Sequence, residues 1–143
     1  MSLKKFYYTR FPIVNSKGHK IAEIARPLVE IILNYKHGSM VGPINALPDS
    51  GADYNLFSSS ICPTLGISLR KGKKFSVVGI SGEEIITYRH YGISIFIEGY
   101  KFETFIDFSD HYQDTPILGQ QGFFDKFKSI KFSRVKEEII LEH

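Results

Sequence analysis

Ala46-Leu47-Pro48-Asp49-Ser50-Gly51-Ala52-Asp53 is the stretch around which the chain is organised. A short apolar approach brings one carboxylate, Asp49, onto a Ser-Gly turn. Asp-Ser-Gly triplets occur in many ordinary turns, so the triplet alone predicts no more than a turn. Two other features give it weight. Pro116-Ile117-Leu118-Gly119 follows later in the chain, and a hairpin pattern with its tip near Gly79-Ile80-Ser81-Gly82 lies between the two.

Length and composition indicate one ordinary globular domain. The chain has 143 residues, of which 43% are hydrophobic and 23% charged, and a domain of this size can bury a core without disulfides or metals. The aromatic content of 14% favours a β-rich fold. We expect a single domain over residues 1–141, with an N-terminal strand or extension at 1–26. Residues 142–143 are interpreted as a tag remnant.

Several partners and compartments are disfavoured. The single Cys62 excludes an internal disulfide and fits a reducing compartment, so we expect a cytoplasmic location. No stretch approaches the roughly 20 apolar residues that span a bilayer, so no membrane partner is expected. The basic cluster at residues 70–74 is interpreted as a solvated turn, because a nucleic-acid surface usually shows several such clusters with interleaved aromatic residues. No nucleic-acid partner and no cofactor are expected.

The hydrophobic pattern predicts an all-β fold. Strands are expected at residues 6–14, 27–35, 40–48, 75–78, 84–88, 91–98, 100–108, 129–133 and 137–141. Short helical segments are expected at 57–65 and 121–127, and a polar loop at 109–115. The strands at 27–35 and 40–48 should form a hairpin that places Asp49 at a strand end. Connections this short do not allow parallel crossovers, so we expect a mostly antiparallel, closed, barrel-like sheet with one short C-terminal helix.

One carboxylate on a glycine turn is half of a known kind of catalytic site. Two carboxylates that share one proton can hydrolyse a peptide bond without a metal: one takes a proton from water while the other donates to the carbonyl oxygen. Such a site needs slim turns, which Gly51 and Ala52 allow, and a neighbouring hydroxyl, which Ser50 supplies. It also needs a mobile cover, for which the hairpin around residues 79–82 is the candidate.

These motifs, in this order, resemble the retropepsin-like aspartic proteases, in particular their cellular and bacterial single-domain members. Asp49-Ser50-Gly51-Ala52-Asp53 is similar to the family's Asp-(Thr/Ser)-Gly-Ala-Asp signature, and Ile117-Leu118-Gly119 to the segment that threads behind the active-site turn. Gly122-Phe123-Phe124-Asp125-Lys126-Phe127 resembles a helix of the family. The resemblance covers residues 27–141. It implies the retropepsin (acid protease) fold and a two-fold homodimer.

The resemblance also implies roles for individual residues. Asp49 would be the catalytic residue, supported by Ser50, Gly51 and Ala52, with Ser50 joining an inter-subunit hydrogen-bond lock. Substrate contacts would come from Asp53, Gly79, Ile80, Ser81, Gly82 and Ile117. Only one such motif is present and the chain has no room for a second lobe, so the two carboxylates must come from two copies of Asp49. The expected partners are therefore a second copy of the chain and a polypeptide in an extended conformation.

The chain departs from the family pattern at three places. Gln120 stands where the family often has an arginine that pairs with the aspartate corresponding to Asp53, and Gln120 can hydrogen-bond this carboxylate but not neutralise it. Pro48 replaces the usual aliphatic residue and lacks an N–H, so the strand before Asp49 should be irregular or lie at an edge near Pro43 and Pro48. The segment before residue 27 is longer than in minimal viral enzymes.

Other interpretations of the same residues remain open. The Ser50 hydroxyl could be a nucleophile with His19, His37 or His90, although the Gly-x-Ser-x-Gly elbow is missing. His111 near Asp107, Asp110 and Asp114 could hold a metal, although a hydrated polar loop is the simpler interpretation. Phe123, Phe124 and Phe127 are interpreted as core residues. Two functions are carried forward: an aspartic endopeptidase, and a non-catalytic dimerisation or peptide-binding module with the same fold.

Overall fold

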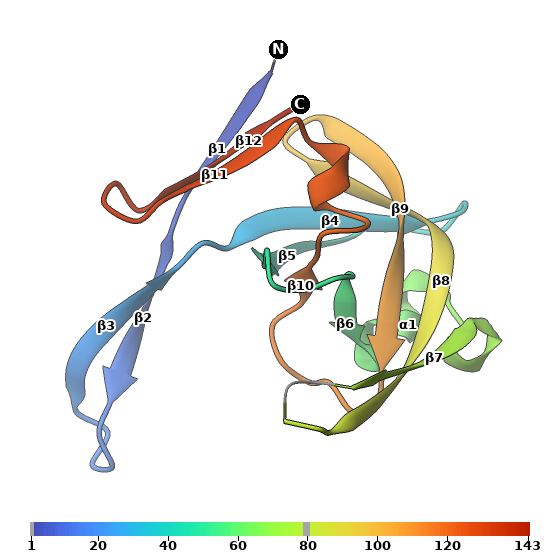
Figure 1. The fold of residues 1–143 in the computed structure, drawn as a ribbon, viewed down its shortest axis with the longest axis horizontal. Coiled ribbons are helices and arrows are strands. Elements are labelled where there is room, and N and C mark those ends of the chain that lie inside the picture. The colour runs from blue at the N-terminus through green and yellow to red at the C-terminus, as the bar shows by residue number, and fades with distance from the viewer. Residues whose placement is uncertain (1, 79–80) are drawn as a thin grey trace.

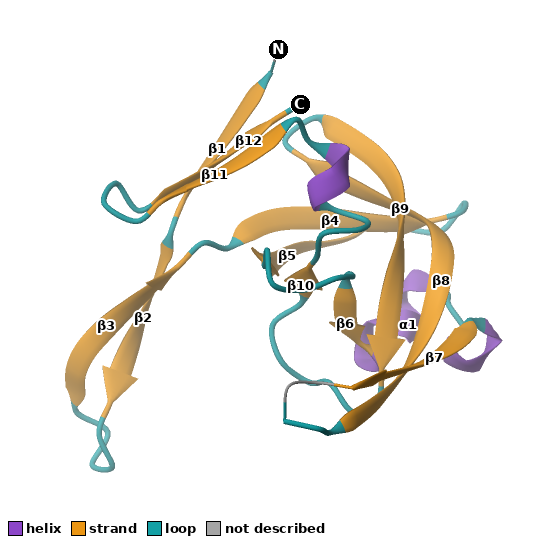
Figure 2. Ribbon diagram, in the orientation of Figure 1, coloured by secondary structure: helices purple, strands orange, loops and turns teal. Residues whose placement is uncertain are grey.

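The computed structural model describes residues 2–78 and 81–143 and consists mainly of β-strands (Figures 1 and 2). The strands are β1 (Leu3–Tyr7), β2 (Thr9–Val14), β3 (Lys20–Arg26), β4 (Val29–Tyr35), β5 (Val41–Pro48), β6 (Leu56–Ser58), β7 (Lys73–Val78), β8 (Glu84–Ile97), β9 (Tyr100–Ser109), β10 (Ile117–Leu118), β11 (Ser129–Ser133) and β12 (Glu138–Glu142). The helix α1 spans Cys62–Leu65, and single 3₁₀ turns lie at Ser59–Ile61, Leu69–Lys71 and Phe124–Lys126.

Six strands close into a barrel. The order is β4-β5-β10-β6-β9-β8, and β8 pairs back with β4, while β7 extends the sheet beyond β8. This confirms the predicted all-β, barrel-like fold. Two pairs, β5–β10 and β6–β9, are parallel, and the other pairings of the barrel are antiparallel. Each parallel pair joins strands that are far apart in the sequence. The sequence argument considered only short connections between neighbouring strands, so it did not predict these two parallel pairs.

The barrel interior is filled by the inward-facing residues of its strands. Along β8, Ile93, Ile95 and Ile97 are fully buried, and along β4, Ile31 and Leu33 are fully buried as well. This alternation is what a strand with one face on the core requires. Each such side chain stabilises the fold by about 1.5–3 kcal/mol relative to an exposed position. The barrel interior is therefore a packed core, so we look for a functional site at the rim of the barrel.

Strand boundaries differ from the sequence expectation in several places. The segments 84–88 and 91–98 form one strand, β8, which bends where its register shifts between His90 and Ile93 and where Gly92 has φ 76°. Such a bulge turns a strand without ending it. The segment 6–14 is divided at Tyr8 into β1 and β2, and residues 20–26, to which no element was assigned, form β3. The pairing of β4 with β5 shifts register between Ile31 and Leu33 of β4, opposite the part of β5 that contains Pro43.

The helical segments are short. Helical turns precede Gly66 as predicted, but they begin at Ser59 and not at residue 57, because residues 57–58 belong to strand β6. Gly66 ends α1 in the left-handed conformation (φ 79°), and Pro63 lies in the first turn of α1. The helix expected at 121–127 is reduced to the 3₁₀ turn Phe124–Lys126, because Phe123 leaves helical geometry (φ −133°) and its ring is fully buried. The core interpretation of the three phenylalanines is confirmed, since Phe124 and Phe127 also pack against the core. No helix in the described residues is long and apolar enough to cross a membrane.

The two ends of the chain lie in a separate three-stranded sheet, here called the terminal sheet, in the order β1-β12-β11 (Figure 1). Glu142 lies in β12 between Leu3 and Ser129. His143 exchanges two backbone hydrogen bonds with Ser2, at 2.9 and 3.0 Å, and its ring stacks on Tyr100 at 3.8 Å. Residues 142–143 therefore take part in the fold, while their origin as a tag remnant stays a prediction.

Strands β2 and β3 pair only with each other and form a hairpin that extends away from the barrel (Figure 1). We call residues 9–26 the N-terminal arm. None of these residues belongs to the hydrophobic core or packs against it. The expected N-terminal extension is thus a projecting two-stranded structure.

Candidate active site

Asp49 follows directly after β5, at the rim of the barrel. The short strand β10 lies parallel to the end of β5 and holds it in place. The N–H of Leu47 donates to the carbonyl of Pro116, and the N–H of Asp49 donates to the carbonyl of Leu118, each at 2.8 Å. The segment predicted to thread behind the Asp49 turn therefore does so, and it fixes the backbone from which the carboxylate projects.

Pro48 fits this strand end for a geometric reason. Successive N–H groups of a strand point to opposite sides. The N–H groups of Leu47 and Asp49 both point toward β10, so an N–H at Pro48 would point away from it. The proline therefore removes no hydrogen bond of the β5–β10 ladder.

The turn after Asp49 is held by the aspartate itself. The N–H of Gly51 donates to Asp49 Oδ1 at 2.9 Å, and the N–H of Ala52 donates to the Asp49 carbonyl at 3.1 Å. Among the described residues, Asp49 Oδ2 accepts no hydrogen bond. Asp49 is half-buried, while Ser50 and Gly51 are exposed. One carboxylate oxygen is thus used to shape the turn, and the other is left for an external group.

Gly119 requires the absence of a side chain. A Cβ atom there would lie 2.4 Å from the carbonyl oxygen of Tyr54 and 2.7 Å from its nitrogen. Both are rigid backbone atoms, so a larger residue would push the segment after β10 away from Tyr54 and the Asp49 turn. The glycine of the Ile117-Leu118-Gly119 segment is therefore needed for close approach of two backbones.

Asn55 is a supporting residue that the sequence did not indicate. Its side chain is fully buried. Its Oδ1 accepts from the N–H of Gly119 at 3.0 Å, and its Nδ2 donates to the carbonyl of Phe105 in β9 at 3.0 Å. One side chain thus joins the active-site turn to two other segments. The local signal was a polar residue between Tyr54 and Leu56, next to a predicted site.

A pocket of about 340 Å³ lies between the active-site turn and the β7–β8 hairpin. Its walls are Gly51, Ala52, Asp53, Tyr54, Asn55, Leu56, Val77, Val78, Ile85, Thr87, Asp107 and Ile117. Two predicted substrate contacts, Asp53 and Ile117, are among them. Ser81 and Gly82 are not, and Gly79 and Ile80 lie outside the described residues. The antiparallel pairing of β7 with β8 confirms the predicted hairpin.

Gln120 does not contact the carboxylate of Asp53, contrary to expectation. Its Nε2 donates to the carbonyl of Ser50 at 2.8 Å, and its N–H donates to the carbonyl of Ala52 at 2.9 Å. Gln120 therefore braces the main chain of the turn. Within the described residues, the Asp53 carboxylate forms no hydrogen bond or ion pair, and Asp53 lines the pocket.

An ion pair that sequence reasoning missed lies in the wall of this pocket. Arg89 in β8 donates to Asp107 in β9 through two nitrogens, at 2.7 and 3.1 Å, and its guanidinium lies 4.4 Å from the ring centres of Tyr54, Phe75 and Phe105. The hydrogen bond to Asp107 raises the pKa of Arg89 above its usual value. The pair could not be seen in the sequence, because it depends on the register of β8 against β9.

Tyr112 is a second residue near Asp49 that the sequence did not single out. Its hydroxyl donates to the carbonyl of Thr115 at 2.5 Å. Burial raises the pKa of Tyr112, with further contributions from the charges of Asp114 and Asp49.

The alternative sites receive no support from the contacts. His90 is buried and its Nε2 pairs with the carbonyl of Leu69 at 2.9 Å; within the described part of the chain, no histidine hydrogen-bonds Ser50. Asp107 is occupied by Arg89, and Asp110 accepts from Ser59 at 2.5 Å. In residues 2–78 and 81–143, no three His, Cys, Asp or Glu side chains form a group that could hold a metal.

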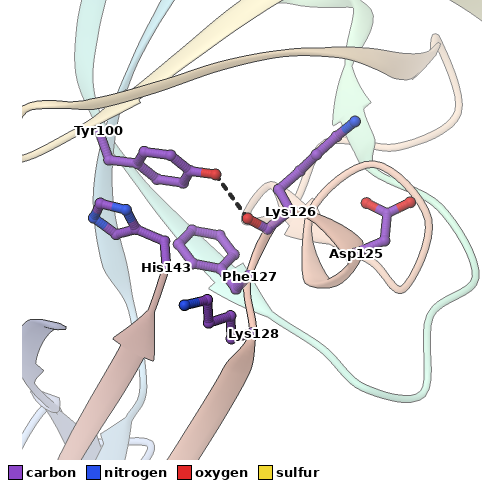
Figure 3. A pocket seen from close by; sticks show the side chains of 6 residues that line it. All are labelled: Tyr100, Asp125, Lys126, Phe127, Lys128 and His143. Carbon is purple, nitrogen blue, oxygen red and sulfur yellow. Dashed lines mark hydrogen bonds between the residues drawn. The ribbon is translucent and has the colours of Figure 1, made fainter. Parts of the chain in front are cut away.

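Another depression lies away from the Asp49 turn, where the end of the chain meets the 3₁₀ turn Phe124–Lys126 (Figure 3). The Tyr100 hydroxyl donates to the Lys126 carbonyl at 2.7 Å, and the His143 ring stacks on Tyr100. The aromatic groups are thus engaged with the protein itself. This depression shares no lining residue with the pocket beside Asp49.

Comparisons with known proteins bear on the fold. No protein-family model matches the chain, and no curated protein matches it. A retropepsin-like aspartic protease from Rickettsia conorii, solved as a crystal structure, is similar over 99% of both chains, with 18% identity and a TM-score of 0.62. EIAV protease complexed with the inhibitor HBY-793 is 24% identical over 66% of this chain and 81% of its own, with a TM-score of 0.49. The barrel, the segment threaded behind the Asp49 turn and the full-length similarity to the Rickettsia structure together show that the chain has a retropepsin-like fold.

Proposed function

We propose that the protein is an aspartic endopeptidase that is active as a homodimer. The observation that supports it is the Asp49 turn, which follows β5 in a retropepsin-like barrel. Its backbone is held by β10, and among the described residues Asp49 Oδ2 accepts no hydrogen bond. Two such turns, one from each chain, would place two carboxylates around one water. One carboxylate would take a proton from the water while the other, protonated, donates to the peptide carbonyl.

The remaining residues have roles as supports and substrate contacts. Ser50 is exposed next to Asp49, where its hydroxyl can bond to the partner's turn. The pocket between the turn and the β7–β8 hairpin is lined mostly by apolar residues, and Asp53 is one of its charged lining residues. An extended peptide in this position would place a side chain in the pocket and offer its backbone N–H groups to Asp53. The β7–β8 hairpin would close over it and exclude water.

The test is digestion of a peptide library by the wild type and by Asp49→Asn, from acid to neutral pH, with and without a pepstatin-like inhibitor. We expect inhibitor-sensitive cleavage by the wild type and none by Asp49→Asn, which has nearly the same shape but cannot act as a base. Asp125→Asn is the matched control, because the new amide oxygen can still accept from the Gly122 N–H as Asp125 does at 3.1 Å.

Full activity of Asp49→Asn would refute the aspartic mechanism. Peptide binding without hydrolysis by the wild type would instead favour a non-catalytic peptide-binding or dimerisation module. Binding of the inhibitor is measured separately through the melting temperature, which rises with occupancy when a ligand binds only the folded state.

A further inference from the structure

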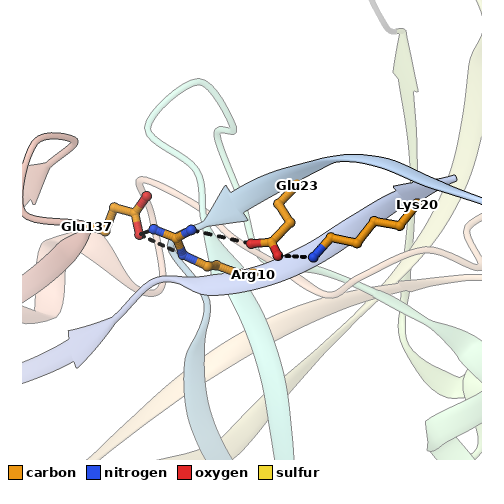
Figure 4. Close-up of polar contacts among 4 residues, drawn as sticks. All are labelled: Arg10, Lys20, Glu23 and Glu137. Carbon is orange, nitrogen blue, oxygen red and sulfur yellow. Dashed lines mark hydrogen bonds and ion pairs between the residues drawn. The ribbon is translucent and has the colours of Figure 1, made fainter.

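The N-terminal arm has two different faces. Directly opposed residues of two paired strands lie on the same face. One face is formed by the pairs Arg10–Ala25, Pro12–Glu23 and Val14–Lys20. Its charged residues are paired, because Arg10 donates to Glu23 at 3.3 Å and Lys20 pairs with the same carboxylate (Figure 4). The apolar residues of this face are Pro12, Val14 and Ala25, and they alternate with these charged groups. The charged groups of this face are thus paired with one another and need no partner from another molecule.

The opposite face of the arm is mainly apolar and largely exposed. At its base lies the pair Thr9–Arg26, and the Arg26 guanidinium is 5.8 Å from the centre of the Phe11 ring. The face continues with the pairs Phe11–Ile24 and Ile13–Ala22, and we call these four residues the apolar arm face. Phe11, Ile13 and Ile24 are 38%, 41% and 38% exposed, and Ala22 is exposed as well. Isolated two-stranded hairpins are marginal in water, and contiguous exposed apolar residues mark interaction sites. Within residues 2–78 and 81–143, the face does not pack against the hydrophobic core.

The direction of the arm is nevertheless set by the terminal sheet. Only Tyr8 separates β1 from β2, and its N–H donates to the Glu137 carbonyl at 2.8 Å. Arg10 donates to the Glu137 carboxylate through two nitrogens, at 2.7 and 3.1 Å (Figure 4). The base of the arm is thus tied to the turn between β11 and β12. A hairpin that is anchored at its base and bare on one face is suited to reach another molecule.

Two observations point to a second copy of this chain as that molecule. The site holds a single Asp49, so the proposed function requires a second chain, and in Figure 1 the arm extends on the side of the barrel on which β5 ends, just before Asp49. The area is also suitable. A face two strands wide and six residues long covers on the order of 200 Å², about a quarter of the roughly 800 Å² that each partner gives to a standard interface.

We propose that the apolar arm face packs against a second copy of the chain and clasps the dimer from both sides, one arm from each chain. This inference rests on the proposed function, which supplies the need for two copies. In a two-fold dimer each arm makes the same contact, so one apolar residue counts twice per dimer. The contact of the arm would then increase the affinity between the two chains, in addition to any contact between the two Asp49 turns.

Two neighbouring residues of β2 give a matched pair of variants. Ile13 lies on the apolar arm face, and Val14, which is 54% exposed, lies on the other face. The dimer dissociation constant of the full chain is measured by sedimentation velocity over a wide concentration range for the wild type, Ile13→Ser and Val14→Ser. We expect Ile13→Ser to raise it by about tenfold or more, as for a residue at the centre of an interface, and Val14→Ser to leave it within about twofold.

A second variant tests whether Ile13→Ser acts on the dimer contact or only disturbs the folding of the arm. Ala22→Arg keeps the hairpin hydrogen bonds and puts a charge on the apolar arm face, so it should weaken the dimer as Ile13→Ser does. Circular dichroism and the melting temperature of each variant check that the barrel is folded. Equal dissociation constants for Ile13→Ser and Val14→Ser would overturn the proposal. A wild type that stays monomeric and binds a membrane or an unrelated protein through the apolar arm face would overturn it as well.

The outcomes separate this inference from the proposed function. A wild-type dimer that Ile13→Ser dissociates but that cleaves no peptide supports the arm contact and refutes the protease. An active wild-type dimer that Ile13→Ser leaves intact refutes the arm contact and keeps the protease.

Discussion

Asn55 gives the sharpest test of how the active-site turn is supported. In Asn55→Ala the Gly119 N–H and the Phe105 carbonyl, which the side chain now satisfies at 3.0 Å each, lose their partner in the protein interior. A buried polar group without a partner costs about 1–3 kcal/mol, so two of them cost about 2–6 kcal/mol. We expect the free energy of unfolding to fall by about 4 kcal/mol, a large part of the 5–15 kcal/mol typical of a domain.

The assay is urea unfolding followed by circular dichroism, with the free energy obtained by linear extrapolation. Asn45→Ala is the matched control, because Asn45 is an exposed residue of β5 and an exposed substitution should change stability by no more than about 0.5 kcal/mol. Asn55→Ala should also lose peptide cleavage below its unfolding midpoint, since Gly119 and the turn are no longer joined. A loss of stability below about 1 kcal/mol would show that the two bonds do not support the turn as argued.

The other predictions concern two buried groups. Arg89→Met leaves Asp107, whose side chain is 3% exposed, without its cation. We therefore expect the free energy of unfolding, measured in urea, to fall by about 3–5 kcal/mol and to be largely recovered in Arg89→Met/Asp107→Leu. A single variant as stable as the double variant would contradict this. Burial, with a smaller effect from the Asp110 charge, raises the pKa of the Cys62 thiol to about 11. The folded state therefore holds this proton more tightly than the unfolded chain, a contribution that is complete below about pH 9 and is lost up to about pH 11. Stability should fall more steeply over that range in the wild type than in Cys62→Ala, and parallel curves would refute it.

Local sequence was sufficient for the elements that depend on neighbouring residues. The hairpin β4–β5 that ends at Asp49 and the glycine that stops α1 follow from alternation and turn chemistry. The likeness of two short motifs to a known family was sufficient for the fold class. The helix at 121–127 was overestimated, because burial of the Phe123 ring, and not helix propensity, decides the backbone there.

Only the tertiary structure decided which distant residues meet. The parallel pairing of β5 with β10, the hydrogen bonds of Asn55 to two other segments, and the Arg89–Asp107 pair all join residues well separated in the chain. Each depends on strand register, and a shift of one residue turns every side chain to the other face. The same holds for the arm: its sequence shows apolar residues, but only the pairing of β2 with β3 gathers Phe11, Ile13 and Ile24 on one largely exposed face. The sequence by itself thus determined the carboxylate and its turn, while the register of distant strands decided what supports that turn and which residues form the apolar arm face.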